Sequence, residues 1–208
     1  MTRASYDIVA ASYARLIPDA HDGRPLDAAI MRAFAELAEG PVGDLGCGTG
    51  RITQHLHELG LDAFGVDLSG GMLEQARKLY PHLNFDQGDI TNLDLEDDSL
   101  GGAVVWYSTV HMPAETVPWQ EFHRVVKPGG YLLHAFKLGD RKRHLSHAYG
   151  HDVDLDVYWH DIDETVRNAT EAGFNEVARL QRQKGADEGG PQAFLLLRKR
   201  NPEVRETS

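Results

Sequence analysis

Three glycines alternate with other residues in the stretch VGDLGCGTGR, at positions 46, 48 and 50, directly after a short apolar run. Glycines in a turn allow unusual backbone angles and let a ligand lie against the main chain without an intervening Cβ atom. The next apolar run ends in Asp67, whose carboxylate is placed to accept hydrogen bonds from both hydroxyls of a ribose. The glycine turn and this carboxylate together predict a binding site for an adenosine-like cofactor.

The glycine spacing separates two classes of cofactor. A dinucleotide-binding turn follows the pattern G-x-G-x-x-G, which here would need a glycine at position 51, where the chain has Arg51. Asp44 also brings a carboxylate to the turn, which disfavours a pyrophosphate and suits a cofactor that carries positive charge. S-adenosylmethionine has an ammonium and a sulfonium and no phosphate. The glycine spacing therefore disfavours NAD and an NAD-dependent oxidoreductase, and the Asp44 carboxylate favours a cationic cofactor such as S-adenosylmethionine.

The elements that must position this turn are short apolar runs that alternate with helical patterns. The apolar runs, which predict strands, are 41–45, 62–67, 83–89, 101–108, 129–137, 176–183 and 193–199. The predicted helices between them are 51–60, 69–80, 115–129 and 161–174. Alternation of this kind is typical of an α/β fold with a parallel sheet and helices on both faces. Only a glycine-rich loop joins the last two runs, so we expect them to form an antiparallel hairpin at the sheet edge.

The sequence resembles the class I S-adenosylmethionine-dependent methyltransferases over nearly its whole length. DLGCGTG is similar to the first motif of that family, GVDLSGGMLEQAR to the second and FDQGDI to the third. AVVWYSTVHM resembles the fourth strand, and EFHRVVKPGGYLLHAF the fifth strand with its preceding helix. The resemblance is closest to members that act on small molecules. It implies a Rossmann-like, doubly wound, mostly parallel seven-stranded sheet.

The resemblance also assigns roles in cofactor binding. Asp44 and the glycines would line the methionine end, Asp67 would hold the ribose, and Leu68 and Met72 would sandwich the adenine. Asp89 and Ile90 would meet the adenine amino edge, and Trp106 and Ser108 would lie beside the sulfonium. The N-terminal segment, 1–40, would cover the cofactor through Tyr6 and Tyr13. The implied cofactor-binding set is Tyr6, Tyr13, Asp44, Gly46, Cys47, Gly48, Gly50, Asp67, Leu68, Met72, Asp89, Ile90, Trp106 and Ser108.

Cys47, the single cysteine of the chain, lies inside the glycine turn. A packing role is favoured over a nucleophile, because the turn is tight and the resembled family accepts other small residues at this position. The transfer is an in-line displacement at an activated carbon, in which the protein mainly aligns the reactants and excludes water. A base is needed only where the acceptor must lose a proton. His111, just after the fourth strand, is placed to be that base, or it is a histidine bonded to the backbone at a strand end.

The segment 138–160 is a long loop in this prediction, and it forms the acceptor side of the site. His144, His147 and His151 would share one face if the segment were helical, which would suit a metal ion. Methyl transfer needs no metal, so a polar and aromatic pocket wall is favoured. The predicted acceptor-binding residues are His111, His147, Tyr149, His151, Tyr158 and Trp159. A basic cluster, 141–143, is either a solvated turn or a binding site for an acidic acceptor.

The composition disfavours several classes of binding partner. The net charge of -11 disfavours nucleic acids and anionic membranes. One cysteine forms no intramolecular disulfide, and no apolar run approaches the length of a bilayer span, so we expect a cytoplasmic protein. We expect one domain, 1–200, with a tail, 201–208, as a monomer or homodimer. A nucleic-acid amino-methyltransferase is disfavoured because WYSTVH replaces the Pro-Pro-Tyr-type motif, whereas a non-catalytic cofactor-binding module stays open.

Overall fold

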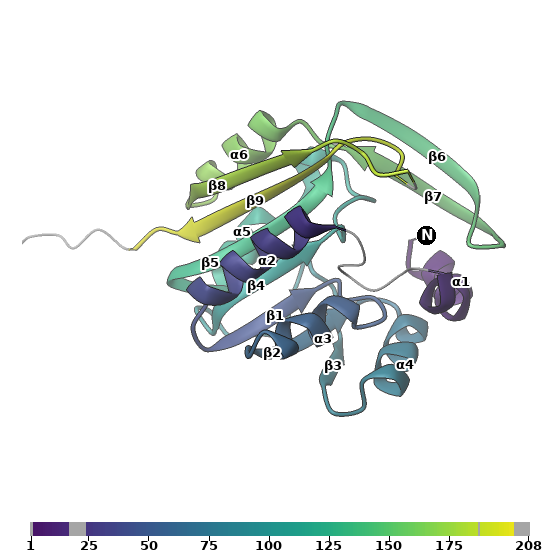
Figure 1. Ribbon diagram of the computed structural model, residues 1–208, viewed down its shortest axis with the longest axis horizontal. Helices are drawn as coiled ribbons and strands as arrows, with labels where there is room; N and C mark the ends of the chain where they lie inside the picture. The colour runs from purple at the N-terminus through teal and green to yellow at the C-terminus, as the bar shows by residue number, and fades with distance from the viewer. Residues whose placement is uncertain (1, 17–23, 187, 202–208) are drawn as a thin grey trace, which may run out of the picture.

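The computed structural model describes residues 2–16, 24–186 and 188–201. In these ranges seven strands form one sheet in the order β3-β2-β1-β4-β5-β9-β8 (Figure 1). Neighbouring strands from β3 to β5 are parallel, and β9 is antiparallel to both β5 and β8. This confirms the doubly wound sheet and its antiparallel edge hairpin. The bounds are β1 Pro41–Leu45, β2 Asp62–Asp67, β3 Asn84–Gln87, β4 Leu100–Trp106, β5 Val126–Lys137, β8 Phe174–Arg182 and β9 Gln192–Lys199.

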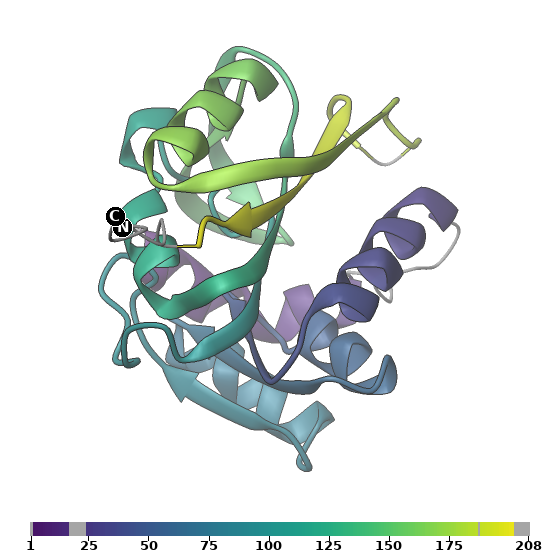
Figure 2. The same ribbon diagram turned by 90° about the vertical axis from the view of Figure 1, so that its left-hand side faces the viewer.

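Helices cover both faces of the sheet because its central strands are apolar on both sides. Every residue of β4 is buried, and its side chains alternate between two cores. α2 (Pro25–Leu37) and α3 (Arg51–Glu58) pack on one face, and α5 (Trp119–Val125) and α6 (Ile162–Glu171) on the other. Figure 2 shows α2 and α6 on opposite sides of the sheet. The layers therefore fix the carboxyl ends of β1, β2 and β4, where a ligand of this fold class binds.

A β-hairpin occupies the segment that the sequence predicts as a loop. β6 (Arg141–Ala148) pairs antiparallel with β7 (His151–Trp159), and Tyr149 and Gly150, both with positive φ, form the turn. In β7 the buried side chains, Leu155, Val157 and Trp159, occur at every second position, which is the period of a strand. The loop prediction was wrong, because the aspartates between the apolar residues occupy the more exposed positions of a strand and do not interrupt it. The helical face proposed for the three histidines does not exist.

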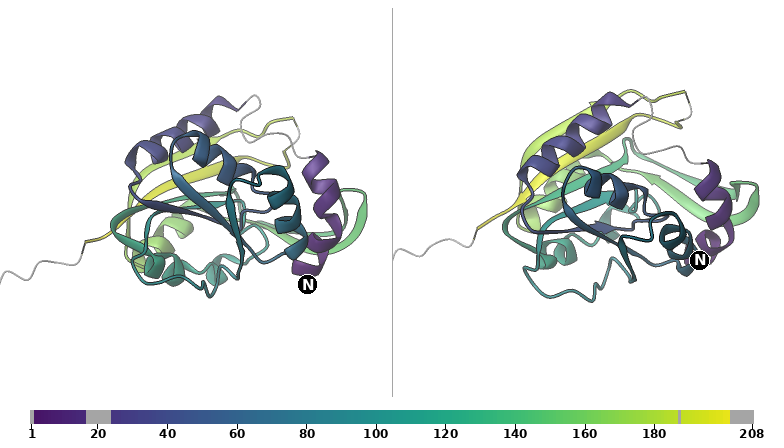
Figure 3. Two further views of the ribbon diagram at one scale, coloured as in Figure 1. Left: turned by 90° about the horizontal axis from the view of Figure 1, so that it is seen from below. Right: turned by 60° about the horizontal axis from the view of Figure 1, so that its bottom comes forward.

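α1 (Thr2–Leu16) lies against α4 (Gly70–Leu79) and the β6–β7 hairpin (Figure 3). The Asp7 carboxylate accepts hydrogen bonds from the Ser69 hydroxyl at 2.6 Å and from the Gly71 backbone N–H at 3.0 Å. A carboxylate at a helix N-terminus also interacts favourably with the helix dipole. Ser69 caps α4 by accepting a hydrogen bond from the Met72 N–H, as its position before the helix predicts. α1 is thus fixed at the start of α4.

Only part of the predicted covering segment covers a cavity. α2 places Met31 and Phe34 in the core against the sheet, because its apolar residues form one helical face. The cover consists of α1. The remaining residues of the segment and of the predicted tail, 17–23 and 202–208, lie outside the described residues. Within the described part, no helix combines the length and apolar character needed to cross a membrane.

We expect Gly70→Ala and Gly71→Ala to affect stability differently. Alanine in a helix restricts the unfolded chain and stabilises by about 0.5–1 kcal/mol where its Cβ has space. At Gly70 the new Cβ meets only the end of the Gln87 side chain, at 3.8 Å. At Gly71 it would lie 3.1 Å from the Asp7 backbone, so α1 must shift. Urea unfolding should show a gain for Gly70→Ala and none for Gly71→Ala; equal gains would contradict the contact.

Candidate functional site

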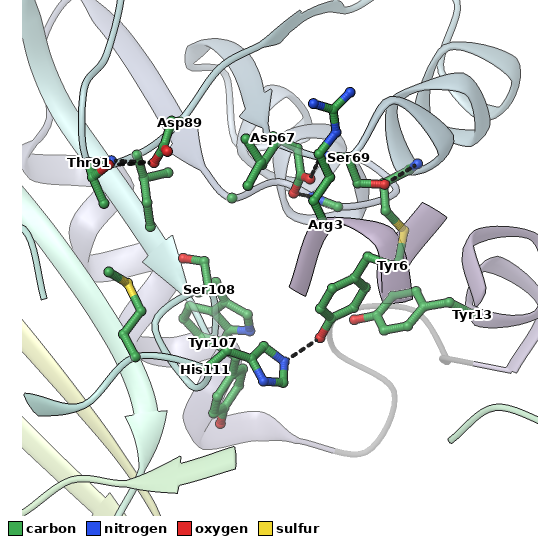
Figure 4. Close-up of a pocket in the computed structure, with 17 residues that line it drawn as sticks. Arg3, Tyr6, Tyr13, Asp67, Ser69, Asp89, Thr91, Tyr107, Ser108 and His111 are labelled. Carbon is green, nitrogen blue, oxygen red and sulfur yellow. Dashed lines mark hydrogen bonds between the residues drawn. The ribbon is translucent and has the colours of Figure 1, made fainter. Parts of the chain in front are cut away.

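A cavity of about 260 Å³ lies at the carboxyl ends of β1, β2 and β4, and α1 closes one side of it (Figure 4). Its walls come from segments far apart in the chain, which the sheet order brings together. The lining residues are Arg3, Tyr6, Tyr13, Gly46, Gly48, Asp67, Leu68, Ser69, Met72, Asp89, Ile90, Thr91, Trp106, Tyr107, Ser108, His111 and Met112.

Most of the predicted cofactor residues lie on this wall, and three lie behind it. Asp44, Cys47 and Gly50 do not line the cavity. The Asp44 side chain faces α3, whereas Cys47 and Gly50 face α4 and β3. The sequence analysis missed several lining residues: Arg3, Ser69, Thr91, Tyr107 and Met112. Arg3 could have been found one helical turn before Tyr6. Tyr107 carries no signal in the sequence, since its positive φ of 57° appears only in the structure.

The three glycines of the turn are needed for three different reasons, and all have positive φ. A Cβ at Gly46 would collide with the Ser108 side chain, so Gly46 lets the end of β4 approach β1. A Cβ at Gly50 would lie 2.6 Å from the Phe85 ring. A Cβ at Gly48 would meet nothing within 4 Å and would project into the cavity. Gly48 is therefore the position where a ligand has direct access to the backbone.

Asp67 is fixed at the end of β2 by two backbone donors. Its Oδ2 accepts a hydrogen bond from the Gly48 N–H at 2.8 Å, and its Oδ1 accepts one from the Ser69 N–H at 2.8 Å. Burial raises the pKa of this carboxyl, and the two hydrogen bonds oppose that shift. Each oxygen keeps a lone pair, so the carboxylate can accept two neighbouring hydroxyl groups from a ligand.

Asp44 places a second carboxylate behind the turn. Its Oδ2 accepts a hydrogen bond from the Thr53 hydroxyl at 2.7 Å, whereas its Oδ1 is buried without a hydrogen-bond partner among the described residues. Burial raises the pKa of Asp44 to about 7. A cationic ligand beside Asp44 and Asp67 would stabilise their ionised forms, whereas a pyrophosphate would be repelled by them. S-adenosylmethionine, with its ammonium and sulfonium, fits this arrangement.

Cys47 has the surroundings of a packing residue. Its side chain is buried in a cluster with Leu73, Ala76, Leu83 and Phe85. Burial raises the pKa of the thiol well above its ordinary value, so the sulfur stays protonated at neutral pH. Because the thiolate is the nucleophilic form, this environment supports packing over nucleophilic catalysis.

His111 connects the cavity wall to the hairpin through Nδ1 and to α1 through Nε2. Nδ1 lies 2.6 Å from the backbone carbonyl oxygen of Asp156, which can only accept, so Nδ1 carries the proton and donates it. Nε2 then accepts a hydrogen bond from the Tyr6 hydroxyl at 2.7 Å (Figure 4). Burial lowers the pKa of His111 and raises that of Tyr6, so the pair is a neutral imidazole and a phenol. The backbone-bonded histidine and the potential base are the same residue.

A second cavity, about 410 Å³, adjoins the first and shares Tyr6 and His111 with it. Of the predicted acceptor residues, Tyr149 and Trp159 also line it. Its remaining walls come from the ends of β4 and β5, the β6–β7 hairpin and the β8–β9 connection. Tyr6 and His111 therefore stand between two cavities.

Three predicted acceptor residues lie outside this second cavity. His151 Nε2 and the Ser12 hydroxyl of α1 form a hydrogen bond at 2.9 Å. His147 is exposed, and its Nδ1 lies 3.1 Å from the Asp152 carboxylate. The ammonium of Lys142 lies over the Tyr158 ring. Tyr158 lies on the other face of β7 from Val157 and Trp159, because strand side chains alternate between faces. His147 and His151 lie next to the turn of the hairpin, beyond a register shift after Leu145. Within 2–16, 24–186 and 188–201, no three His, Cys, Asp or Glu side chains are arranged to hold a metal ion.

Comparisons with known proteins agree with this geometry. A family model described as methyltransferase domain matches residues 42–130. Over 95 residues the chain is 37% identical to malonyl-[acyl-carrier protein] O-methyltransferase of Yersinia pestis, covering 43% of this chain and 34% of that protein. It is 33% identical over 90 residues to demethylmenaquinone methyltransferase of Paenarthrobacter aurescens, covering 43% and 36%. The chain thus spans about a third of the length of these relatives.

Solved structures show the same fold. An S-adenosylmethionine-dependent methyltransferase from Methanosarcina mazei superposes with a TM-score of 0.70 at 17% identity, covering 79% of this chain and 94% of that one. At this identity the likeness concerns the arrangement of strands and helices alone.

We expect Asp44→Asn to change how stability depends on pH. The Asp44 carboxyl has a folded pKa of about 7, raised from 3.8. Its contribution to stability is therefore fully present below pH 3.8 and is lost as pH rises through about 7. An amide does not titrate, so the variant should gain melting temperature relative to the wild type as pH rises from about 5 to 8. Parallel melting-temperature curves for the two proteins would contradict the burial of this charge.

Proposed function

The chain belongs to the class I S-adenosylmethionine-dependent methyltransferase family, and from this premise we propose that it is an enzyme that methylates a small-molecule acceptor. The observation that carries the proposal is the junction of two cavities at Tyr6 and His111. One cavity has the features of a site for a cationic nucleoside, and the other is open for an acceptor. The bound cofactor would supply an activated methyl group, which transfers by in-line displacement.

The residues of the first cavity would hold the cofactor in a fixed position. Asp67 would accept hydrogen bonds from the ribose hydroxyls, and Gly48 would leave room for the ligand beside the backbone. Asp89 is oriented by Thr91, whose N–H and hydroxyl donate to Asp89 Oδ1 at 2.9 and 2.7 Å. Its Oδ2 is then available for an amino group such as that of adenine. Leu68 and Met72 would contact the faces of the base.

His111 would act as the base where the acceptor carries a hydroxyl or ammonium. An acceptor group that displaces the Tyr6 hydroxyl from Nε2 would donate its proton to this nitrogen as the new bond to carbon forms. The ring would become a cation, and the Asp156 carbonyl would stabilise its Nδ1–H. Tyr6 would then close the boundary between the cavities and exclude water.

Two other functions are less well supported. A nucleic-acid acceptor is disfavoured by the net charge of -11. A non-catalytic module that only binds S-adenosylmethionine would need the first cavity but neither the second cavity nor a histidine with a fixed tautomer. The relatives named above are methyltransferases with small or carrier-bound acceptors by their names, which supports an enzyme.

We predict that Asp67→Ala weakens binding of S-adenosylmethionine by about 10- to 150-fold, equivalent to about 1.5–3 kcal/mol for lost charge-assisted hydrogen bonds. Titration calorimetry would measure this, with NAD as a ligand that should show no binding. Asp86→Ala, on exposed β3, is the matched control and should bind normally. Full affinity in Asp67→Ala, or binding of NAD, would exclude the proposed cofactor site.

We predict that the His111 imidazole is the Nδ1–H tautomer and titrates below pH 6.5, because burial lowers its pKa. A base must be neutral to accept a proton, so turnover should rise with pH through that lowered pKa and be constant from about pH 7 to 8. Nitrogen NMR of the imidazole would report the tautomer and the pKa directly.

The variant His111→Ala should lose about a hundredfold or more in turnover while keeping its affinity for the cofactor within about threefold. His147→Ala removes an exposed histidine from the hairpin and should leave both quantities unchanged. Normal turnover in His111→Ala, with an acceptor that must lose a proton, would remove this residue from the reaction.

A further inference from the structure

The second cavity is strongly basic although the protein is acidic. The chain has 32 acidic and 21 basic residues, Lys and Arg. Yet among the described residues no Asp or Glu lines this cavity, whereas four basic residues do: Lys137, Arg141, Lys142 and Arg143. A positive cavity in a negative protein concentrates anions, because field lines are focused in a low-dielectric cleft.

Lys137 is the cation in this cavity that most needs a partner. It lies at the end of β5, half-buried, and its ammonium forms no hydrogen bond or ion pair with any residue that the structure describes. Its Nζ lies 5.7 Å from the centre of the Trp159 ring. Glu188 attracts it from the β8–β9 connection, but both oxygens of that carboxylate are held by Arg182, at 2.6 and 2.8 Å. An anion in the cavity would supply the missing partner.

Arg141 is held beside Lys137 in a fixed orientation. Its guanidinium stacks on the Trp159 ring at 4.1 Å and donates a hydrogen bond to the Gly189 carbonyl. The stacking leaves other N–H groups of the fork available for a carboxylate or phosphate. Lys142 differs, because Asp156 already pairs with it at 2.7 Å. Lys137 and Arg141 therefore form the anion-binding end of the cavity.

The hairpin makes the opposite end of the cavity apolar. Arg141 pairs with Trp159, Arg143 with Val157, and Leu145 with Leu155 across β6 and β7. These alternate positions share one face of the hairpin, and all six side chains line the cavity. The face changes along the strands from cationic and aromatic to aliphatic. A ligand that matches it has an anionic group at one end and an apolar body.

We propose that the methyl acceptor is an amphipathic anion, whose carboxylate or phosphate binds between Lys137 and Arg141 and whose apolar body lies against Leu145 and Leu155. That this anion is the methyl acceptor depends on the proposed function. The anion-binding site itself depends only on the second cavity. The shared residue His111 then lies between the anion and the cofactor cavity.

Calorimetry on the full chain, with S-adenosylhomocysteine bound, tests the site with three probes of equal chain length: octanoate, octyl phosphate and octanamide. We expect at least one anion to bind about tenfold or more tightly than the neutral amide. Preference for octanoate or octyl phosphate identifies the group as a carboxylate or a phosphate. Equal affinity for all three probes, or binding of none, would overturn the proposal.

Lys137→Met keeps the length and apolar character of the side chain and removes the charge. It should reduce the affinity for the preferred anion by about tenfold or more and leave the affinity for octanamide unchanged. Lys127→Met, at the other end of β5, is the control and should bind all probes normally. Unchanged anion binding in Lys137→Met would overturn the assignment. Retained binding of S-adenosylhomocysteine shows that each variant is folded.

The same titrations separate this proposal from the proposed function. Anion binding in a protein that does not bind S-adenosylhomocysteine would leave the anion site standing and reject the methyltransferase. Binding of S-adenosylhomocysteine without discrimination between octanoate, octyl phosphate and octanamide would reject the anionic acceptor and leave the methyltransferase standing.

Discussion

The hydrogen-bonded chain from the Tyr6 hydroxyl through the His111 ring to the Asp156 carbonyl joins three segments that are distant in sequence. Tyr6 belongs to α1, His111 follows β4, and Asp156 lies in β7. The covering helix, the sheet and the hairpin thus meet at one imidazole. Because a carbonyl oxygen only accepts, this chain also fixes Nδ1 of His111 as the protonated nitrogen and Nε2 as the acceptor. Both cavities depend on this arrangement for their common wall.

The charges of the site are divided at the same wall. The carboxyl groups of Asp67 and Asp89 line the cofactor side, and the cations of Lys137 and Arg141 line the other side. A cationic cofactor and an anionic acceptor would each be attracted to its own cavity and repelled from the other. The two ligands would then be oriented by long-range electrostatics before any short-range contact forms. The neutral imidazole between them adds no charge that would disturb this division.

Much of the fold and the cofactor side could be predicted from the sequence, because local signals there are strong. The seven strands are apolar runs bounded by turns, and the glycine spacing at 46, 48 and 50 identifies the type of loop. The predicted helix 69–80 exists as α4, with Ser69 as its cap. These features depend on residues that are close together in the chain. Asp44 was predicted less well. The sequence analysis expected it on the cavity wall, whereas in the structure it lies behind the wall and accepts a hydrogen bond from Thr53.

The acceptor side was predicted less well, because it is built from long-range contacts. The alternation of Val153, Leu155, Val157 and Trp159 is a strand signal, but the length of the segment 138–160 between two predicted elements favoured a loop. Lys137 is the last residue of the predicted strand 129–137. Nothing in the sequence shows that its ammonium faces a cavity or lacks an acidic partner there. The role of the basic cluster, 141–143, becomes clear only from the structure of β6. Arg141 and Arg143 line the second cavity, and Lys142 pairs with Asp156.

The most direct test follows carbon-13 from the methyl group of S-adenosylmethionine into small molecules. The protein would be incubated with the labelled cofactor and the small-molecule fraction of a cell extract, and products would be measured by mass spectrometry. The account predicts one labelled small molecule formed in equal amount to S-adenosylhomocysteine, and loss of both products in Asp67→Ala. Tight cofactor binding with no label transferred to any small molecule would contradict it and identify a binding module instead.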